Sequence, residues 1–297
     1  MRVTLVHNPN AGDGQPSAKD LQQMLDHSGF QVRYVSTKKE WKKALSRPAD
    51  LAVAAGGDGT AAKVLKAVAG TGMPVALMPI GTANNIGRSL GIAGRHLRDM
   101  VAGWKGGTRR QFDVGAVRFG HGGRELFVEA CGGGPFATAI QRGKAEVEHG
   151  SPFAGNEIDR ALSFNRSLME TAPVQRWSVQ VDGRDYSGDY IGVEVMNIRF
   201  AGPSVPLARE ADSSDGLLDV VFLKDSDRPQ LIDYLDRRLA HDETTLPRLD
   251  TVRGTLINLE PPSGVLRVDD GLEDDVRGPA EISLMPGAVT VLLPSLG

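Results

Sequence analysis

The first 110 residues alternate between short segments rich in apolar and β-branched residues and segments in which apolar residues recur at helical spacing. The short segments have the length of buried strands, and they are 2–7, 31–35, 51–55 and 75–78. Between them, apolar residues three and four positions apart predict helices, as at Leu21, Met24 and Leu25. Strands that alternate with helices predict βαβ units and a parallel sheet.

From about Asp113 the apolar residues follow a different period. Trp177, Val179 and Val181 alternate with polar residues up to Asp182-Gly183, which is typical of a hairpin turn. Further short strands are predicted at 191–195, 217–223, 265–268, 282–284 and 289–293, and helices at 156–171 and 229–239. The second half is therefore predicted to be a mainly antiparallel β-domain.

This change of period predicts two domains. We expect an α/β domain over residues 1–112 and a β-rich domain over residues 113–285, with the tail 286–297 as a candidate to return to the first domain. Gly106-Gly107 mark the boundary. A chain of 297 residues is long enough to form two such cores.

Composition narrows the class of protein. A formal net charge of −3 gives no support to nucleic-acid binding, and a single cysteine, Cys131, excludes a disulfide framework and fits a reducing cytosol. The apolar stretch at the amino terminus is too short for a secretory signal, and no segment approaches the about 18 to 20 apolar residues of a membrane span. We therefore expect a cytoplasmic protein without a transmembrane segment.

Two segments have the form of a capping box, in which a Ser or Thr and the acid three residues later bond each other's backbone. Ser17 with Asp20 predicts the start of one helix, and Thr37 with Glu40 predicts the start of another that runs toward Leu45. This pattern explains Thr37 without a ligand.

The turn Gly56-Gly57-Asp58-Gly59-Thr60 connects the strand 51–55 to a helix. Glycines allow backbone N–H groups to approach an anion, and the helix that follows directs its positive end at the same place. Asp58 could hold Mg²⁺ or take a proton, and Thr60 has the side chain of a helix cap. The turn therefore predicts a phosphate site, with a tight connection as the alternative.

Two more loops leave predicted parallel strands at the same edge of the sheet. They are Asn8-Pro9-Asn10-Ala11-Gly12 and the segment PIGTANN over 79–85. In open parallel sheets, ligands bind beyond the carboxyl ends of the strands. We therefore expect the ligand site of the first domain at this edge.

Five motifs in one order resemble the diacylglycerol kinase catalytic domain family of bacterial lipid kinases. They are NPNAG (8–12), GGDGT (56–60), PIGTANNIGRSLGI (79–92), VMNIRFAGPSVPLAREADSSDGLLDVV (195–221) and DDGLEDD (269–275). NAD kinases share the GGDGT loop, but their paired Asn-Glu is not found here. The resemblance implies an N-terminal parallel-sheet α/β domain, Rossmann-like and similar to NAD kinases and phosphofructokinases, and a C-terminal antiparallel β-sandwich.

The resemblance also implies an ATP-dependent lipid kinase of phospholipid metabolism. It would transfer the γ-phosphoryl of ATP to a hydroxyl of a diacylglycerol-like lipid and need Mg²⁺. The nucleotide contacts of the family, with their neighbours in the loops, fall on Asn8, Ala11, Gly12, Thr37, Gly56, Gly57, Asp58, Gly59, Thr60, Lys63, Thr82 and Asn84. For Thr37, the capping box stays open as an alternative to a nucleotide contact.

Phosphorylating an alcohol needs a carboxylate near the hydroxyl to take its proton. Asp270-Gly271 matches the family's catalytic Asp-Gly-Glu, so the resemblance implies Asp270 as the general base, with Asp58 organising Mg²⁺. The alternative is that 269–275 is only a solvated acidic hairpin.

The resemblance implies a structural Mg²⁺ site in the loop 212–219. The family's ligands fall on Asp212, Asp215 and the carbonyl of Leu217. Closely spaced acids around a glycine suit a hard cation. The same residues equally well form a turn before the strand 217–223.

Three residues depart from the family's motifs. Lys63 and Leu272 stand where the family has glutamate, and Asn85 stands where it has aspartate. Each change removes a negative charge where nucleotide and Mg²⁺ are expected. The departures support one alternative, a nucleotide- or lipid-binding relative with little or no activity; a kinase of a soluble alcohol, similar to NAD kinases, is another.

The lipid end of the site is weakly specified. Segments 132–136 and 156–171 could wall an acyl-chain pocket, and ordinary core packing explains their apolar residues equally well. A basic stretch could meet an anionic membrane or be a solvated helix face, and its members are Arg88, Arg95, His96, Arg98, Lys105, Arg109 and Arg110. We expect peripheral contact at the inner membrane face. The acceptor and the oligomeric state stay open, a homodimer included.

Overall fold

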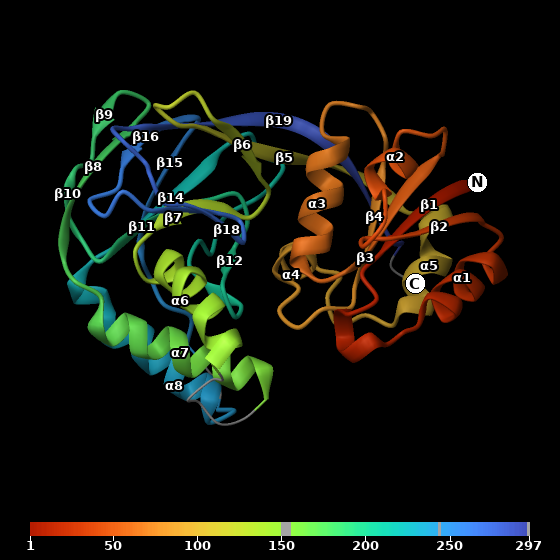
Figure 1. Cartoon of the computed structure of the whole chain (residues 1–297), viewed down its shortest axis with the longest axis horizontal. Coiled ribbons are helices and arrows are strands. Elements are labelled where there is room, and N and C mark those ends of the chain that lie inside the picture. Colours follow the sequence, from red (N-terminus) through yellow and green to blue (C-terminus); the bar gives the residue numbers. More distant parts are fainter. Residues whose placement is uncertain (150–155, 243–244, 296–297) are drawn as a thin grey trace. The chain divides into compact units, whose positions relative to one another are not determined.

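The computed structural model describes residues 1–149, 156–242 and 245–295. The chain divides into two compact units (Figure 1), of which unit 1 comprises Met1–Val114, Ser213–Asp215 and Pro286–Gly297, and unit 2 comprises Gly115–Asp212 and Gly216–Met285. Parts of the predicted domains lie outside the described residues, namely 150–155, 243–244 and 296–297. The predicted domain bounds, 1–112 and 113–285 with the tail 286–297 as a candidate to return to the first domain, stay a prediction.

Unit 1 is built on a parallel sheet. Its strands are β1 (Arg2–His7), β2 (Gln31–Ser36), β3 (Leu51–Gly56) and β4 (Val75–Pro79), in the order β2-β1-β3-β4. Next to β4 lies the end of the long strand β19 (Ala280–Leu293), where Val291 pairs with Val75 in parallel. The strands predicted from the first half of the sequence are all present.

Helices cover both faces of this sheet (Figure 1). They are η1 (Ala11–Gly14), α1 (Ala18–His27), α2 (Trp41–Leu45), α3 (Asp58–Val68), α4 (Asn85–Ser89), α5 (Leu97–Gly103) and η2 (Trp104–Gly106). On one face, Leu21 and Leu25 of α1 and Val101 of α5 pack in one core with residues of β1, β3 and β4. On the other face, α3 buries Val64 and Leu65. Burial from both sides explains why every residue of β3 is buried.

Of the two predicted capping boxes, one is present and the other is not. At Ser17 the prediction is confirmed, because Ser17 Oγ accepts the backbone N–H of Asp20 at 3.3 Å and the Asp20 carboxylate accepts the N–H of Ser17 at 3.0 Å. At Thr37 it is wrong, because α2 begins only at Trp41. The backbone N–H of Thr37 instead donates to the carbonyl of His7 at 2.8 Å, which continues the pairing of β2 with β1.

Unit 2 contains two antiparallel sheets. One holds β8 (Gln175–Val181), β9 (Arg184–Asp185), β10 (Gly188–Tyr190), β16 (Leu256–Glu260), β6 (Arg124–Phe127), the first half of β19, and the part of β5 (Thr108–Arg118) from Gly115 onward. The other has the order β15-β14-β11-β7-β17-β18, with β15 (Asp250–Gly254), β14 (Leu218–Leu223), β11 (Gly192–Met196), β7 (Ala130–Gly133), β17 (Leu266–Val268) and β18 (Gly271–Glu273). A short ribbon pairs β12 (Phe200–Ala201) with β13 (Val205–Pro206).

The two sheets pack as a sandwich, which follows from the alternation of side chains along each strand. Val220 and Phe222 of β14 share a core with Trp177 and Val179 of β8. Val221 and Leu223, on the other face of β14, share a second core with the helices. The predicted β-sandwich is therefore confirmed.

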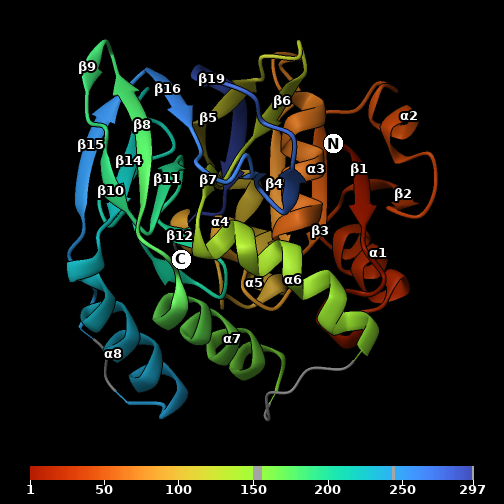
Figure 2. The same ribbon diagram turned by 60° about the vertical axis from the view of Figure 1, so that its left-hand side comes forward.

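Among the residues that the structure describes, three helices belong to unit 2 (Figure 2): α6 (Pro135–His149), α7 (Glu157–Thr171) and α8 (Arg228–Leu239), with the short η3 (Asp225–Asp227) before α8. The sequence predicted α7 and α8 and missed α6. The predicted strands 282–284 and 289–293 are one strand, β19. Within the described residues, no helix is long and apolar enough to cross a bilayer.

Candidate functional site

The three predicted phosphate loops lie together at the carboxyl edge of the sheet in unit 1. Asn8, directly after β1, donates its backbone N–H to the carbonyl of Ala55 at 2.9 Å, and Ile80, directly after β4, donates to the carbonyl of Gly56 at 3.1 Å. Gly12 lies against Ile80, because a Cβ on Gly12 would be 2.5 Å from the Ile80 carbonyl oxygen. Gly12 also has φ +59°, which favours glycine.

Gly57 and Gly81 bring the second and third loops into backbone contact. A Cβ on Gly81 would lie 2.3 Å from Gly57 Cα, whereas a Cβ on Gly57 would lie 3.3 Å from Gly81 Cα. Position 81 therefore excludes any side chain at this spacing. The contact leaves bare backbone at the edge where a phosphate is expected.

Asp58 joins the same two loops through its side chain. Its Oδ2 accepts the backbone N–H of Asn85 at 2.8 Å, and its Oδ1 accepts that of Ile86 at 2.9 Å. These N–H groups belong to the first turn of α4, so the carboxylate also offsets the positive end of that short helix. The sequence predicted a metal or proton role for Asp58 and did not reveal this one.

Other predicted loop residues have local structural contacts. Thr60 does not cap α3 as predicted, because the helix begins at Asp58 with Gly57 as N-cap; Thr60 is buried in the first turn, against Gly56. Asn84 has φ 52°, and its amide accepts the N–H of Gly81 at 3.0 Å and donates to the Gly81 carbonyl at 2.6 Å. It therefore holds the turn of the third loop closed.

Lys63 and Thr82 are exposed, and Ala11 is buried in η1. The structure adds one cation that the sequence analysis missed. Lys38, two residues after β2, donates from Nζ to Asn10 Oδ1 at 3.1 Å, and the Asn10 N–H donates to Asn8 Oδ1 at 3.1 Å. A lysine just past the carboxyl end of a parallel strand was the available signal.

His7 ends β1 directly before the first loop. It is 1% exposed, and its Nδ1 lies 3.3 Å from the hydroxyl of Tyr34. Burial lowers the pKa of His7, because the charged imidazolium loses its hydration. The imidazole is therefore neutral at pH 7.

In unit 2, the acidic turn between β17 and β18 contains two adjacent acids that differ in burial. Asp269 is buried, and its carboxylate accepts the backbone N–H of Val128 at 3.0 Å and that of Glu129 at 2.8 Å. Asp270 is exposed. Of the two acids, Asp269 is thus committed to the backbone, and Asp270 is the one whose carboxylate reaches solvent.

Glu273 does not simply replace the glutamate that the family has at position 272. Leu272 and Glu273 are consecutive in β18 and so point to opposite faces of the strand. Glu273 lies 3.7 Å from Nε2 of His121.

Part of the predicted metal loop 212–219, the residues Ser213–Asp215, belongs to unit 1. The Ser213 carbonyl accepts the N–H of Asp113 at 2.6 Å, and Ser214 Oγ accepts from Arg110 at 3.1 Å. Over the described part of the chain, no three His, Cys, Asp or Glu side chains gather as a metal site. The predicted ligands are two carboxylates and a carbonyl, a set of oxygens that suits Mg²⁺, so Asp212, Asp215 and Leu217 stay a prediction.

Unit 2 has a cavity of about 320 Å³ at the start of α6. Gly134 and Pro135 line it from one side and Leu168 and Thr171 of α7 from another, and Trp177 adds an aromatic wall. Both segments that the sequence analysis singled out for an acyl chain, 132–136 and 156–171, thus contribute to one hollow.

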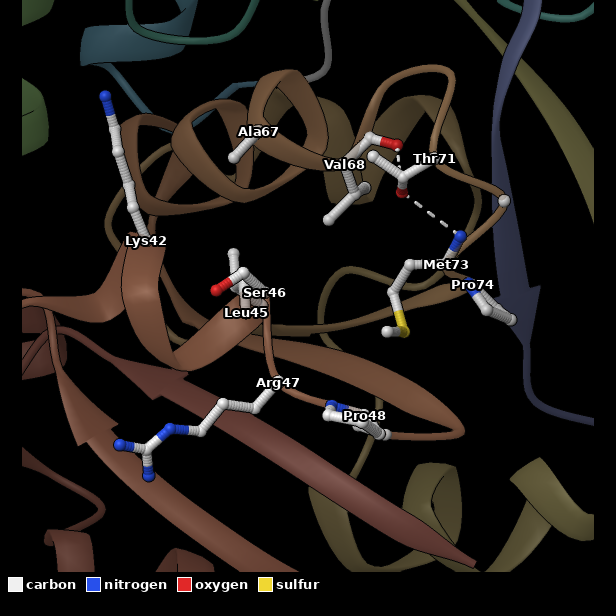
Figure 3. A pocket seen from close by; sticks show the side chains of 12 residues that line it. Lys42, Leu45, Ser46, Arg47, Pro48, Ala67, Val68, Thr71, Met73 and Pro74 are labelled. Carbon is white, nitrogen blue, oxygen red and sulfur yellow. Dashed lines mark hydrogen bonds between the residues drawn. The ribbon is translucent and has the colours of Figure 1, made fainter.

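Unit 1 has a larger open pocket of about 720 Å³ (Figure 3). Leu45, Val68 and Met73 line it, with Lys42 and Arg47 as its cations. It lies beside the residues that precede β3 and β4, at the edge of the sheet opposite the glycine loops. It is therefore separate from the candidate phosphate site.

Two protein-family models match the chain. "Diacylglycerol kinase catalytic domain" matches residues 2–117, and "YegS C-terminal NAD kinase beta sandwich-like domain" matches residues 152–293. Together the matches cover residues 2–117 and 152–293, which leaves Met1, the segment 118–151 and the last four residues outside them.

Two curated relatives are similar to this chain in sequence, and one solved structure is similar to it in fold. A diacylglycerol kinase of Mycobacterium tuberculosis is 24% identical, covering 100% of this chain and 96% of the relative, and one of Bacillus subtilis is 25% identical, covering 78% and 76%. A crystal structure of a diacylglycerol kinase from Bacillus anthracis strain Sterne shares the fold, with a TM-score of 0.71 at 22% identity, covering 98% of this chain and 96% of that one. The chain therefore belongs to the diacylglycerol kinase catalytic domain family of bacterial lipid kinases.

Proposed function

We propose that the protein transfers the γ-phosphoryl group of ATP to a hydroxyl of a diacylglycerol-like lipid. The observation that carries this proposal is the convergence of three loops at one sheet edge, joined by Gly57 against Gly81 and by Asp58 on α4. Bare backbone N–H groups beside helix starts are suited to phosphate oxygens. The names of the relatives, both diacylglycerol kinases, support the choice of acceptor.

In the proposed reaction the acceptor hydroxyl oxygen attacks the γ-phosphorus. The bond from that phosphorus to the oxygen bridging it to the β-phosphate breaks, and ADP leaves. Asp270 takes the hydroxyl proton, since it is the acid of the turn that reaches solvent, whereas Asp269 is bound to the backbone. Asn8, Gly12, Thr37 and Thr82, with the glycine loop, are the proposed nucleotide contacts.

Mg²⁺ would neutralise the charge of the triphosphate, and Asp58 is the carboxylate of the loops that would hold it. The contacts of its two oxygens with the N–H groups of Asn85 and Ile86 hold this carboxylate beside the loops that would bind the triphosphate. Asp212, Asp215 and the Leu217 carbonyl are the proposed ligands of a second, structural Mg²⁺.

The cavity of about 320 Å³ in unit 2 is the proposed place for part of an acyl chain. Its lining combines apolar side chains, among them Leu168, Trp177 and Ile191, with polar ones such as Gln141 and Arg142, and the apolar side would take the methylene groups. Access to such a lipid would need contact with a membrane surface, and the exposed Arg88, Arg95 and Arg98 of unit 1 are suited to anionic headgroups. We place this contact at the cytoplasmic face.

The test is phosphate transfer from labelled ATP to a total lipid extract with Mg²⁺, comparing Asp270→Asn with the wild type. We expect Asp270→Asn to lose at least about 100-fold in kcat, the usual contribution of a general base. The matched control is Asp274→Asn, an exposed acid of the same segment, which should keep wild-type turnover.

Three results would contradict the proposal. Full turnover by Asp270→Asn would remove that residue as the base. Transfer to a soluble alcohol in the absence of lipid would change the acceptor class. ATP binding by the wild type without transfer to any lipid would identify a binding protein instead of a kinase.

A further inference from the structure

Arg267 places a full positive charge inside unit 2, three residues before Asp270. It is 4% exposed, and its partner Glu194 of β11 is fully buried. The guanidinium contacts the Glu194 carboxylate through Nη2 at 2.9 Å and through Nε at 3.0 Å. Burying two charges often stabilises a fold less than a well-packed apolar pair would, so stability alone does not explain this pair.

The pair has a third contact, on the backbone of the acidic turn. Arg267 Nη1 donates to the carbonyl of Asp269 at 3.2 Å. That carbonyl belongs to the peptide bond between Asp269 and Asp270. The guanidinium therefore holds the peptide from which the Asp270 side chain projects.

Asp269 itself adopts a conformation that needs support. Its φ is 51°, in the left-handed region that a residue with a Cβ rarely adopts. Its N–H donates to the Ala130 carbonyl at 2.9 Å, and its carboxylate accepts from Val128 and Glu129. Together with Arg267, these contacts fix the amide, the carboxylate and the carbonyl of the residue before Asp270.

The surroundings make room for the pair. A Cβ on Gly132 of β7 would lie 2.5 Å from Glu194 Oε2, so the glycine admits the carboxylate. The Arg267 guanidinium lies 5.9 Å from the centre of the Phe136 ring, which adds a cation–π contact. Gly132 and Phe136 thus have a role that their assignment to an acyl-chain wall did not include.

We propose that Arg267 and Glu194 are positioning residues for phosphoryl transfer: Glu194 orients Arg267, and Arg267 holds the Asp269 carbonyl so that the Asp270 carboxylate is presented in one orientation. The inference rests on the proposed role of Asp270 as base. A misplaced base lowers the rate of proton transfer without weakening nucleotide binding, whose loops belong to unit 1.

The decisive variant replaces the whole pair, Arg267→Met with Glu194→Leu, because an apolar pair leaves no unpaired charge in the core. We expect kcat to fall about 10- to 100-fold while KM for ATP stays within about twofold, since small displacements of a reacting group have effects of this size. The control removes an exposed pair of α8, in which Arg237 Nε lies 3.0 Å from Asp233 Oδ2. Asp233→Asn with Arg237→Gln should leave kcat unchanged.

A second readout does not depend on activity. Hydrogen exchange of the backbone amides of 269–271 should become at least about tenfold faster in the double variant, because the turn loses its clamp. If the double variant does not fold, Arg267→Lys decides, since lysine keeps the charge opposite Glu194 but lacks the guanidinium fork. A folded Arg267→Lys variant should have a reduced kcat.

The outcomes separate the two proposals. If Asp270→Asn is inactive and the double variant, or a folded Arg267→Lys variant, turns over at the wild-type rate, the positioning role is wrong and the kinase assignment stands. Wild-type exchange at 269–271 in the double variant also overturns the positioning role. If Asp270→Asn keeps full activity, Asp270 is not the base, and the positioning role falls with it.

Discussion

Gly57 and Gly81 differ in how much space each leaves for a side chain, although both lie at the same loop contact. Gly81→Ala would place a Cβ 2.3 Å from Gly57 Cα and push the loops apart, whereas Gly57→Ala meets a distance of 3.3 Å. We expect Gly81→Ala to lower the free energy of unfolding by about 1 to 3 kcal/mol, as overpacking does, and Gly57→Ala to lower it less. Thermal denaturation of the two variants measures this difference in stability.

The two substitutions should also differ in their effect on the KM for ATP, which is obtained from the reaction rate at increasing ATP concentrations. The KM for ATP should rise about tenfold in Gly81→Ala, because the displaced loops no longer present their N–H groups together. Equal effects of the two substitutions on stability and on KM would contradict the steric argument.

His7 gives unit 1 a predicted sensitivity to acid. Burial lowers its pKa below the value of about 6.5 expected for the unfolded chain. On acidification the unfolded state binds the proton first, so the contribution to stability is complete above pH 6.5 and is lost as the pH falls toward the folded pKa.

The measurement is Tm between pH 7.5 and pH 5 for the wild type and for His7→Gln. Glutamine does not titrate in this range, so the decrease in Tm should be smaller in His7→Gln than in the wild type. Parallel curves would show that His7 does not cause the loss of stability.

At the scale of single residues, the sequence identified the motifs but not all of the contacts. Asp58 was selected for its chemistry, yet its observed partners are backbone N–H groups 27 and 28 residues later, and only the fold brings them together. The adjacent acids Asp269 and Asp270 look alike in the sequence. Their difference in burial depends on contacts of Asp269 with residues about 140 positions earlier.

At the scale of elements, local patterns succeeded where local contacts decide the structure. The capping box of Ser17 and Asp20 is formed within four residues, and it was predictable. Thr37 has the same pattern, but pairing of its N–H with His7 competes with the cap and extends β2. The helix α6 was missed because three glycines precede it, although Pro135 at its first position is a favourable start.

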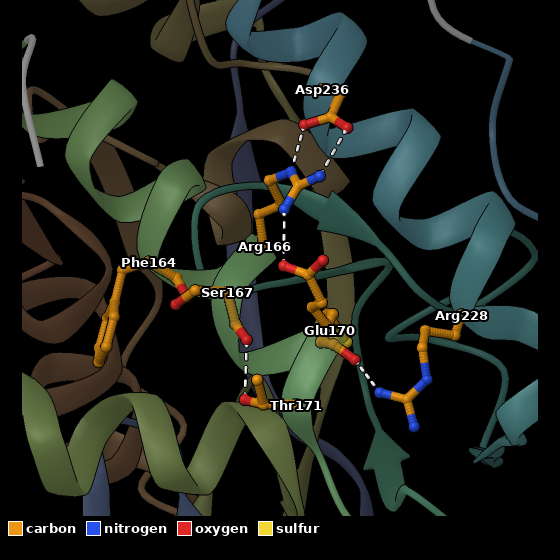
Figure 4. Close-up of polar contacts among 8 residues, drawn as sticks. Phe164, Arg166, Ser167, Glu170, Thr171, Arg228 and Asp236 are labelled. Atoms are coloured by element: carbon orange, nitrogen blue, oxygen red, sulfur yellow. Dashed lines mark hydrogen bonds and ion pairs between the residues drawn. The ribbon is translucent and has the colours of Figure 1, made fainter.

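Arg228 connects α8 to the end of α7, beside the Arg166–Asp236 pair between the same helices (Figure 4). Its guanidinium donates to the carbonyls of Met169 and Ala172, the latter at 2.9 Å, and pairs with Asp225 at 2.7 Å. Arg228→Ala removes the N–H donors from which these carbonyls at the end of α7 accept hydrogen bonds. We expect a loss of about 1 to 3 kcal/mol in the free energy of unfolding, measured by urea denaturation.

Arg237→Ala is the comparison for this variant. Arg237 also pairs with an acid, Asp233, but both side chains are exposed. Such a pair contributes about 0.5 kcal/mol or less. If Arg228→Ala costs no more than Arg237→Ala, the contacts with α7 are not stabilising.

At the scale of the whole molecule, the two periods of the sequence predicted an α/β domain followed by an antiparallel β-domain, because helical spacing and alternation imply different architectures. The sandwich was implied by the resemblance to the family. The strand order was not predictable. Met285-Pro286-Gly287 looks like a loop between two strands, yet β19 continues through it. Gly287 adopts φ +58°, and its N–H donates to Oδ1 of the buried Asp113 at 2.6 Å. The two residues are 174 positions apart in the sequence.

The membership of the second half of β19 in unit 1 has a consequence for synthesis. A ribosome releases the chain from its amino end, so β4 and the glycine loops emerge long before Val291, the residue that pairs with Val75. Until translation reaches that point, one edge of the parallel sheet of unit 1 has no partner strand and is open to pairing with other chains. The nascent protein is therefore expected to depend on chaperones until its last strand has been made.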